Sequence, residues 1–162
     1  MTTIKYDNIK SNNLGKLYSV SVCDGKKIKP IEIKLNNVKS IFGKEKKYNN
    51  FFIKWCINNN DISIIRLIES MLTTSFVNED ITETNSAICI KQNYPTMLES
   101  KIVNTSSHDV ITHKPGEIIT YEDIKNKPCN VTLKLKSVNI PKNKKKLYYN
   151  LEIINIALLN NK

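Results

Sequence analysis

Apolar and polar residues alternate along much of this chain, and a two-residue period indicates half-buried β-strands. Because successive side chains of a strand point to opposite sides of the sheet, each alternating segment has one apolar and one polar face. The sequence therefore predicts a mainly β protein. The apolar positions of the five segments are Tyr18, Val20 and Val22; Ile31, Ile33 and Leu35; Phe51, Ile53, Trp55 and Ile57; Val131, Leu133 and Leu135; and Leu147, Tyr149, Leu151 and Ile153.

One segment has a helical period. Between Asp61 and Phe76, apolar residues recur every three or four positions, which predicts an amphipathic helix over about 60–76, capped by Asn60 or Asp61. Many strands, hairpins and one inserted helix favour a small, partly open antiparallel β-barrel of the OB type, and a two-layer α+β sheet is the alternative. Short strands are expected at 87–91, 97–103 and near 117–121, and a loop at 104–117.

Charge is segregated along the sequence. The 162 residues, expected to form one domain over 1–162, carry a formal net charge of +10. Residues 26–54 have a net charge of +7 and residues 131–162 of +6, whereas residues 55–124 have a net charge of −6. A basic excess favours polyanionic partners, and its segregation predicts that the two basic segments share one surface.

Each basic segment centres on a predicted hairpin turn, at 43–48 and at 141–146. Strand parity puts Phe52 and Tyr148 on the polar faces of the strands that follow these turns. Lysines attract phosphates and exposed rings stack on unpaired bases, so this pattern predicts contact with single-stranded nucleic acid. The alternative is that the lysines are solvated hairpin tips beside ordinary, partly exposed rings. The candidate nucleic-acid-binding residues are Lys44, Lys46, Lys47, Phe52, Lys54, Lys134, Lys136, Lys144, Lys145 and Tyr148.

Signatures of other functions are missing from the sequence. It contains no phosphate-binding loop, dinucleotide fingerprint, nucleophile elbow or paired-histidine zinc motif, so we expect no catalytic activity, no metal site and no cofactor. Four widely spaced cysteines are expected to be free thiols. No apolar run is long enough to span a membrane, and we expect an intracellular protein. Tyr94, before Pro95, fits a stacking platform or a loop anchor equally well.

The order of these motifs resembles the OB-fold single-stranded DNA-binding proteins of large nucleocytoplasmic DNA viruses and, more distantly, those of short-tailed bacteriophages. The resemblance spans about residues 30–158 and implies a barrel completed by the last two strands. The chain ends without the acidic tail that many such proteins use to recruit partners, so recruitment by a tail is not expected. The motifs are Phe42-Gly43, Leu67-Ile68-Glu69, Tyr94-Pro95-Thr96-Met97-Leu98, Lys101-Ile102, Lys134-Leu135-Lys136 and Leu147-Tyr148-Tyr149-Asn150-Leu151.

The resemblance implies a protein that coats single-stranded DNA without sequence specificity during replication or recombination. If the protein is viral, it implies a place in the host cytoplasm, at the viral factory, or in the nucleus. Partners would be single-stranded DNA, a second copy of the chain, and replication proteins, with no membrane association. Two alternatives stay open: a structural or replisome scaffold with a basic interaction face, and an RNA-binding module. The preference for DNA over RNA depends on the resemblance alone.

Overall fold

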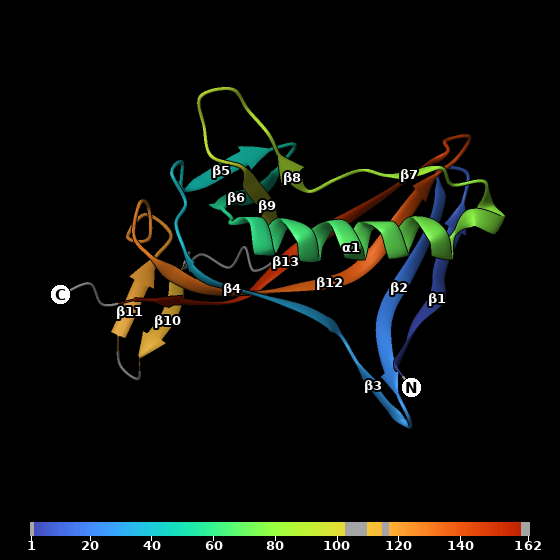
Figure 1. The fold of residues 1–162 in the computed structure, drawn as a ribbon, viewed down its shortest axis with the longest axis horizontal. Helices are drawn as coiled ribbons and strands as arrows, with labels where there is room; N and C mark the ends of the chain where they lie inside the picture. The colour runs from blue at the N-terminus through green and yellow to red at the C-terminus, as the bar shows by residue number, and fades with distance from the viewer. Residues whose placement is uncertain (1, 103–109, 115–116, 160–162) are drawn as a thin grey trace.

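The computed structural model describes residues 2–102, 110–114 and 117–159, and β-strands dominate these residues (Figure 1). The expectation of a mainly β fold with one long helix is confirmed. The strands are β1 (Thr2–Asn12), β2 (Gly15–Asp24), β3 (Lys27–Lys29), β4 (Ile31–Val38), β5 (Lys44–Lys47), β6 (Asn50–Cys56), β7 (Glu83–Thr84), β8 (Ile88–Cys89), β9 (Met97–Ile102), β10 (Val110–Lys114), β11 (Glu117–Thr120), β12 (Cys129–Pro141) and β13 (Lys146–Leu158).

The hairpin of β12 and β13, each 13 residues long, is the central element of the sheet. The first part of β12 pairs with β4 and its last part with β2, both antiparallel. Irregularities in the β12–β13 register, at Thr132/Leu133 and Leu135/Val138, are the kind of β-bulge that increases strand twist. One long strand can thus change neighbours along its length, which lets the β1–β2 hairpin join the same sheet as β4.

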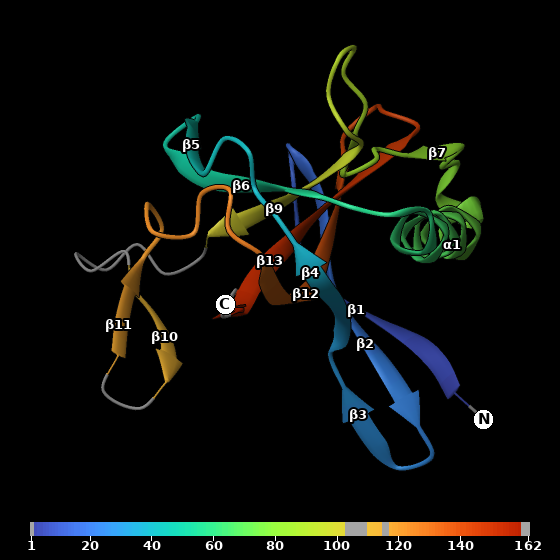
Figure 2. The ribbon, with the colours of Figure 1, turned by 60° about the vertical axis from the view of Figure 1, so that its left-hand side comes forward.

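The sheet is open and mixed. Its principal strand order is β1-β2-β12-β13-β9-β6-β5, so β1 and β5 lie at its two ends. β13 pairs in parallel with β7 and with β9, and the pairing with β9 consists of one position, Glu152 opposite Lys101. The expected antiparallel barrel is therefore not closed. β10 and β11 form a separate hairpin (Figure 2), and Figure 1 shows it on the opposite side of the molecule from β1–β3.

Helix α1 (Asn59–Ser75) confirms the predicted helix to within one residue at each end and crosses the sheet over β12 (Figure 1). Its N-cap is Asn58 rather than Asn60 or Asp61. The Asn58 side chain accepts a hydrogen bond from the Asp61 backbone N–H at 2.8 Å, and the Asp61 carboxylate accepts one from the Asn58 N–H at 3.4 Å. This reciprocal capping box satisfies two backbone donors that the first helical turn would otherwise leave free. A single-turn 3-10 helix, η1 (Val77–Glu79), follows.

The core lies between α1 and the inner face of the sheet, as the alternating pattern predicts. Trp55 is fully buried, and its indole N–H donates to the Ser100 hydroxyl at 2.9 Å. Several elements differ from expectation. β1, β3, β7 and η1 were not predicted, and β5 forms within the turn expected at 43–48, so that the turn itself is only Tyr48–Asn49. Val110–Lys114 forms a strand inside the predicted loop 104–117, the rest of which lies outside the described residues except at its last position. All four cysteines are free, as expected.

No helix within the described ranges combines the length and the apolar character that crossing a membrane requires.

Gly15 marks the closest approach of the β1–β2 hairpin to β12. Its φ is +142°, and a Cβ at this position would overlap the backbone carbonyl oxygen of Ile140. We expect Gly15→Ala to lower the free energy of unfolding by about 3 kcal/mol, because backbone strain and overlap act together. Gly25, with φ +63° and open space around a Cβ, provides the matched control, and Gly25→Ala should lower it by about 1 kcal/mol. Denaturant unfolding followed by Trp55 fluorescence measures both values, and equal losses would contradict close packing at Gly15.

Candidate nucleic-acid interface

A cleft of about 400 Å³ lies between β9 and β13 and receives side chains from both predicted basic hairpins. β9 and β13 meet only where Lys101 faces Glu152. Beyond this point, residues 83–89 lie between the two strands, since β7 pairs with β13 and β8 pairs with β9. The cleft therefore exists because the sheet is open at this place.

One side of the cleft comes from β6 and β9. Phe52 lies on the outer face of β6, opposite Lys101 of β9, and both side chains line the cleft. The two-residue turn Tyr48–Asn49 has positive φ at both positions, as a type I′ turn requires, and it brings Lys47 back beside β6. The Lys47 ammonium lies 5.8 Å from the centre of the Phe52 ring.

The other side of the cleft comes from β12 and β13. Tyr148 of β13 lies opposite Asn139 of β12, and both line the cleft together with Asn150. Two lysines of the hairpin lie over the Tyr148 ring, with the ammonium nitrogen of Lys144 at 5.9 Å and that of Lys146 at 6.0 Å from its centre. Phe52 and Tyr148, which strand parity predicts to be outward-facing rings, are both only partly exposed.

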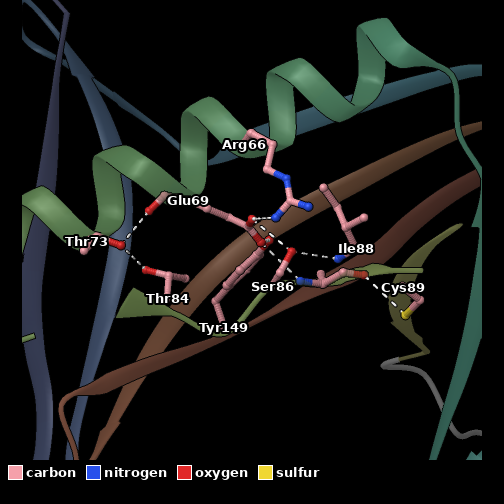
Figure 3. Close-up of polar contacts among 9 residues, drawn as sticks. Arg66, Glu69, Thr73, Thr84, Ser86, Ile88, Cys89 and Tyr149 are labelled. Atoms are coloured by element: carbon pink, nitrogen blue, oxygen red, sulfur yellow. Dashed lines mark hydrogen bonds and ion pairs between the residues drawn. The ribbon is translucent and has the colours of Figure 1, made fainter. Parts of the chain in front are cut away.

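A buried carboxylate, Glu69, contacts the cleft residues Ser86 and Tyr149 (Figure 3). Glu69, on the inner face of α1, is 6% exposed and accepts hydrogen bonds from the Tyr149 hydroxyl at 2.6 Å and the Ser86 hydroxyl at 3.0 Å. The Ala87 backbone N–H donates to the same carboxylate at 3.2 Å, and Arg66 lies 3.6 Å away at the surface. Tyr149, Ser86 and Ala87 all line the cleft. The carboxylate thus fixes three cleft residues from below.

The Glu69 carboxylate faces a hydrogen-bond donor at each of its two oxygens. Burial and the hydrogen bond to Glu69 raise the pKa of the Tyr149 hydroxyl far above its usual value, so this group stays protonated and remains a donor. A carboxylate buried without partners would be strongly unfavourable, whereas three donors and a nearby guanidinium satisfy this one. Both oxygens of Glu69 are thus engaged by residues of the cleft wall, and the cluster acts as a structural support.

The other predicted lysines are distributed unevenly. Register places Lys44 and Lys46 on the face of the β5–β6 hairpin that does not carry Phe52. The Lys44 ammonium lies 4.8 Å from the centre of the Phe51 ring. Lys54 shares the face of Phe52 and lies 3.8 Å from the Glu45 carboxylate. The structure thus brings Lys47, Phe52 and Tyr148 into the lining of the cleft, where Lys47 also lies 3.8 Å from the Glu99 carboxylate. Lys144 lies beside the Tyr148 ring but outside the cleft lining.

Three lysines of the last hairpin lie away from this group. Lys134 is in register between Glu32 of β4 and Glu152 of β13, so carboxylates flank its charge on both sides. Lys136 is exposed within the register irregularity of β12. Lys145, with Lys144, lines a second cavity of about 560 Å³ at the tip of the hairpin. In that cavity Lys16 forms an ion pair of 3.0 Å with Glu79, so these two charges compensate each other.

Sequence reasoning missed several residues of the cleft. Lys101 becomes part of it through pairing with Phe52, and Asn85 lies far from both aromatic rings in the chain. Asn139 lies in the same hairpin as Tyr148, but only the β12–β13 register places it opposite that ring. Only Asn150, two residues from Tyr148 on the same strand face, carries a signal in the sequence. Comparison of the chain with protein-family models, with curated proteins and with solved structures finds no match. The functional argument therefore depends on the geometry of the cleft.

The Glu69 cluster gives a direct stability test. Tyr149→Phe removes the 2.6 Å donor and leaves a buried carboxylate short of one partner, so we expect the free energy of unfolding to fall by about 1.5–3 kcal/mol. Tyr18→Phe is the matched control, because the Tyr18 hydroxyl donates to the partly exposed Glu79 at 3.2 Å and its loss should be below about 1 kcal/mol. Urea unfolding of both variants measures the difference. Indistinguishable losses would show that the Glu69 carboxylate does not depend on Tyr149.

Proposed function

We propose that this protein binds single-stranded nucleic acid, most favourably single-stranded DNA, in the cleft between β9 and β13. The observation that carries the proposal is the pair of partly exposed rings, Phe52 and Tyr148, that line one cleft from its two sides. Each ring has a lysine ammonium within about 6 Å of its centre, Lys47 and Lys144 respectively. Rings for stacking and cations for phosphates are the two components that binding of single strands requires.

The two components act on different parts of a nucleotide. A ring face accepts any base, because every base has a π-face, so stacking gives affinity without selecting a sequence. Lysines neutralise phosphates and release counterions, which makes binding strongly dependent on salt. A paired base cannot leave its stack without an energetic cost, so a cleft of this kind favours unpaired strands over duplex DNA.

The arrangement of strands supports an OB-type relationship as part of this proposal. The β6 end lies beside the chain that follows β4, where the Cys56 N–H donates to the Lys39 carbonyl oxygen at 2.8 Å. The pairings β6–β9, β9–β13, β13–β12 and β12–β4 then complete a ring of five strands. The ring is open at two weak junctions: β4–β6, joined through the hydrogen bond from Cys56, and β9–β13, paired at one position. Along this ring the first four strands in chain order, β4, β6, β9 and β12, have the order 4-1-2-3 of a Greek key.

OB folds bind oligonucleotides with the face of their second and third strands and with the loops between strands 1 and 2 and strands 4 and 5. In the ring described here, the corresponding strands are β6 and β9, which carry Phe52 and Lys101. The corresponding loops are residues 39–49 and 142–145, which carry the lysines of the two basic turns. Two parts of the proposal, a role in coating DNA during replication or recombination and the choice of DNA over RNA, rest on the resemblance of residues 30–158 to viral OB-fold single-stranded DNA-binding proteins.

The aromatic rings provide the first test. We expect Phe52→Ala and Tyr148→Ala each to weaken binding of a labelled 20–30-base oligo-dT by about 1–3 kcal/mol, or roughly 5- to 150-fold, because each removes one stacking surface. Tyr94→Ala is the matched control and should keep the wild-type affinity. Tyr94 is 41% exposed and has the Lys91 ammonium at 5.1 Å, but it lies outside the cleft. Fluorescence anisotropy measures all three. Full affinity in a folded Phe52→Ala/Tyr148→Ala double variant, or equal binding of duplex DNA by the wild type, would refute the proposal.

The lysines provide a second, independent test. Lys101→Gln and Lys144→Gln should each reduce the steepness of the dependence of log K on log salt by about 0.7, the value for one phosphate contact on a single strand. Lys134→Gln, whose lysine lies between two carboxylates in register, should leave the slope unchanged. Titrations at several salt concentrations give the slopes. Equal slopes for all three variants and the wild type would show that the cleft lysines do not meet phosphates.

A further inference from the structure

Three asparagine side chains line the same cleft as the two rings. They are Asn85, Asn139 and Asn150, and all three are exposed. Their side-chain amides make no hydrogen bond to any other residue in the described part of the chain. By contrast, the Asn58 side chain caps α1 and the Asn130 side chain accepts from the Asn37 backbone N–H at 2.9 Å. The amides around the rings are therefore free to bind a ligand.

Ordered backbone fixes the positions from which these three side chains project. Asn139 lies on β12 directly opposite Tyr148, and Asn150 lies two residues further along β13 on the same face as that ring. Asn85 follows β7, and its backbone N–H donates to the Leu147 carbonyl oxygen at 2.7 Å. Because the backbone at these positions is already ordered, binding restricts only the rotation of the side chains themselves.

We infer that the cleft reads the edges of unpaired bases, an inference that rests on the proposed function and extends it. A carboxamide offers both donors and an acceptor, and the four bases differ in the order of donors and acceptors on their edges. Sequence-dependent recognition of single strands combines base stacking on rings with hydrogen bonds to these edges. A volume of about 400 Å³ is in the range of sites that enclose small organic groups. The protein then has a graded base preference in place of complete indifference to sequence.

The experiment uses the full chain and oligonucleotides that combine abasic spacers with nucleotides of one kind. Every base in a given oligonucleotide is therefore the same. Four such probes, carrying adenine, cytosine, guanine or thymine, share length, charge and backbone. Adenine and guanine have the same fused-ring size, and cytosine and thymine the same single-ring size, so a difference within either pair reports on the edge presented rather than on stacking area. For the wild type we expect affinities that differ by about fivefold or more between the best and the worst base. Fluorescence anisotropy at one fixed salt concentration measures them.

The triple variant Asn85→Ala, Asn139→Ala and Asn150→Ala should bring adenine and guanine to within twofold of each other, and likewise cytosine and thymine, while it still binds all four probes through the rings and lysines. A second triple variant is the matched control and should keep the wild-type ranking: Asn36→Ala, Asn60→Ala and Asn155→Ala, all exposed asparagines outside the cleft. Wild-type affinities within twofold, or an unchanged spread in the cleft variant, would overturn the inference alone. Failure of the wild type to bind any probe would instead refute the proposed function.

Discussion

The buried Glu69 carboxylate is the interaction on which the geometry of the cleft depends. It connects three parts of the chain that are remote in sequence: the inner face of α1, the segment at Ser86–Ala87, and Tyr149 of β13. A buried charge is unfavourable unless donors surround it, so this cluster has one arrangement in which the carboxylate is satisfied and many in which it is not. Such a requirement specifies one position for residues 86–87 between β9 and β13, and this position defines the base of the cleft.

The open sheet is the second condition for the cleft. A fully paired β9–β13 junction would continue the ladder beyond Glu152 and Lys101 and would fill the space that Phe52 and Tyr148 now line. The strand pairs that do form, above all the long hairpin of β12 and β13, supply the core and hold the two sides of the cleft apart. A gap in pairing that would weaken a purely structural sheet thus becomes the place where side chains are accessible. Residues 83–89, which bond to both strands there, keep the gap from closing.

Local patterns predicted local features, and long-range pairing decided the rest. Strand parity depends only on neighbouring residues, and it correctly placed Trp55 and Tyr149 inside and Phe52 and Tyr148 outside. Parity alone could not show that Glu32 and Glu152 flank Lys134, because these residues come from three different strands. The same limit explains the missed cleft residues and the unpredicted β1, whose polar outer face gives a weak alternating signal.

The lysines over the two rings bear on how binding would proceed. In the free protein, Lys47 and Lys144 lie close to the faces on which bases would stack. A cation over an exposed ring stabilises by about 0.5–1 kcal/mol, whereas a base stacked on a ring contributes about 1–3 kcal/mol. In the proposed complex, a stacked base would therefore replace the ammonium over each ring, and the displaced lysine would be available to a phosphate. For Lys47 this exchange would also replace its ion pair with Glu99, now at 3.8 Å. Because one flexible side chain covers the ring in the free state and neutralises a phosphate in the complex, stacking and charge neutralisation would be coupled at each ring.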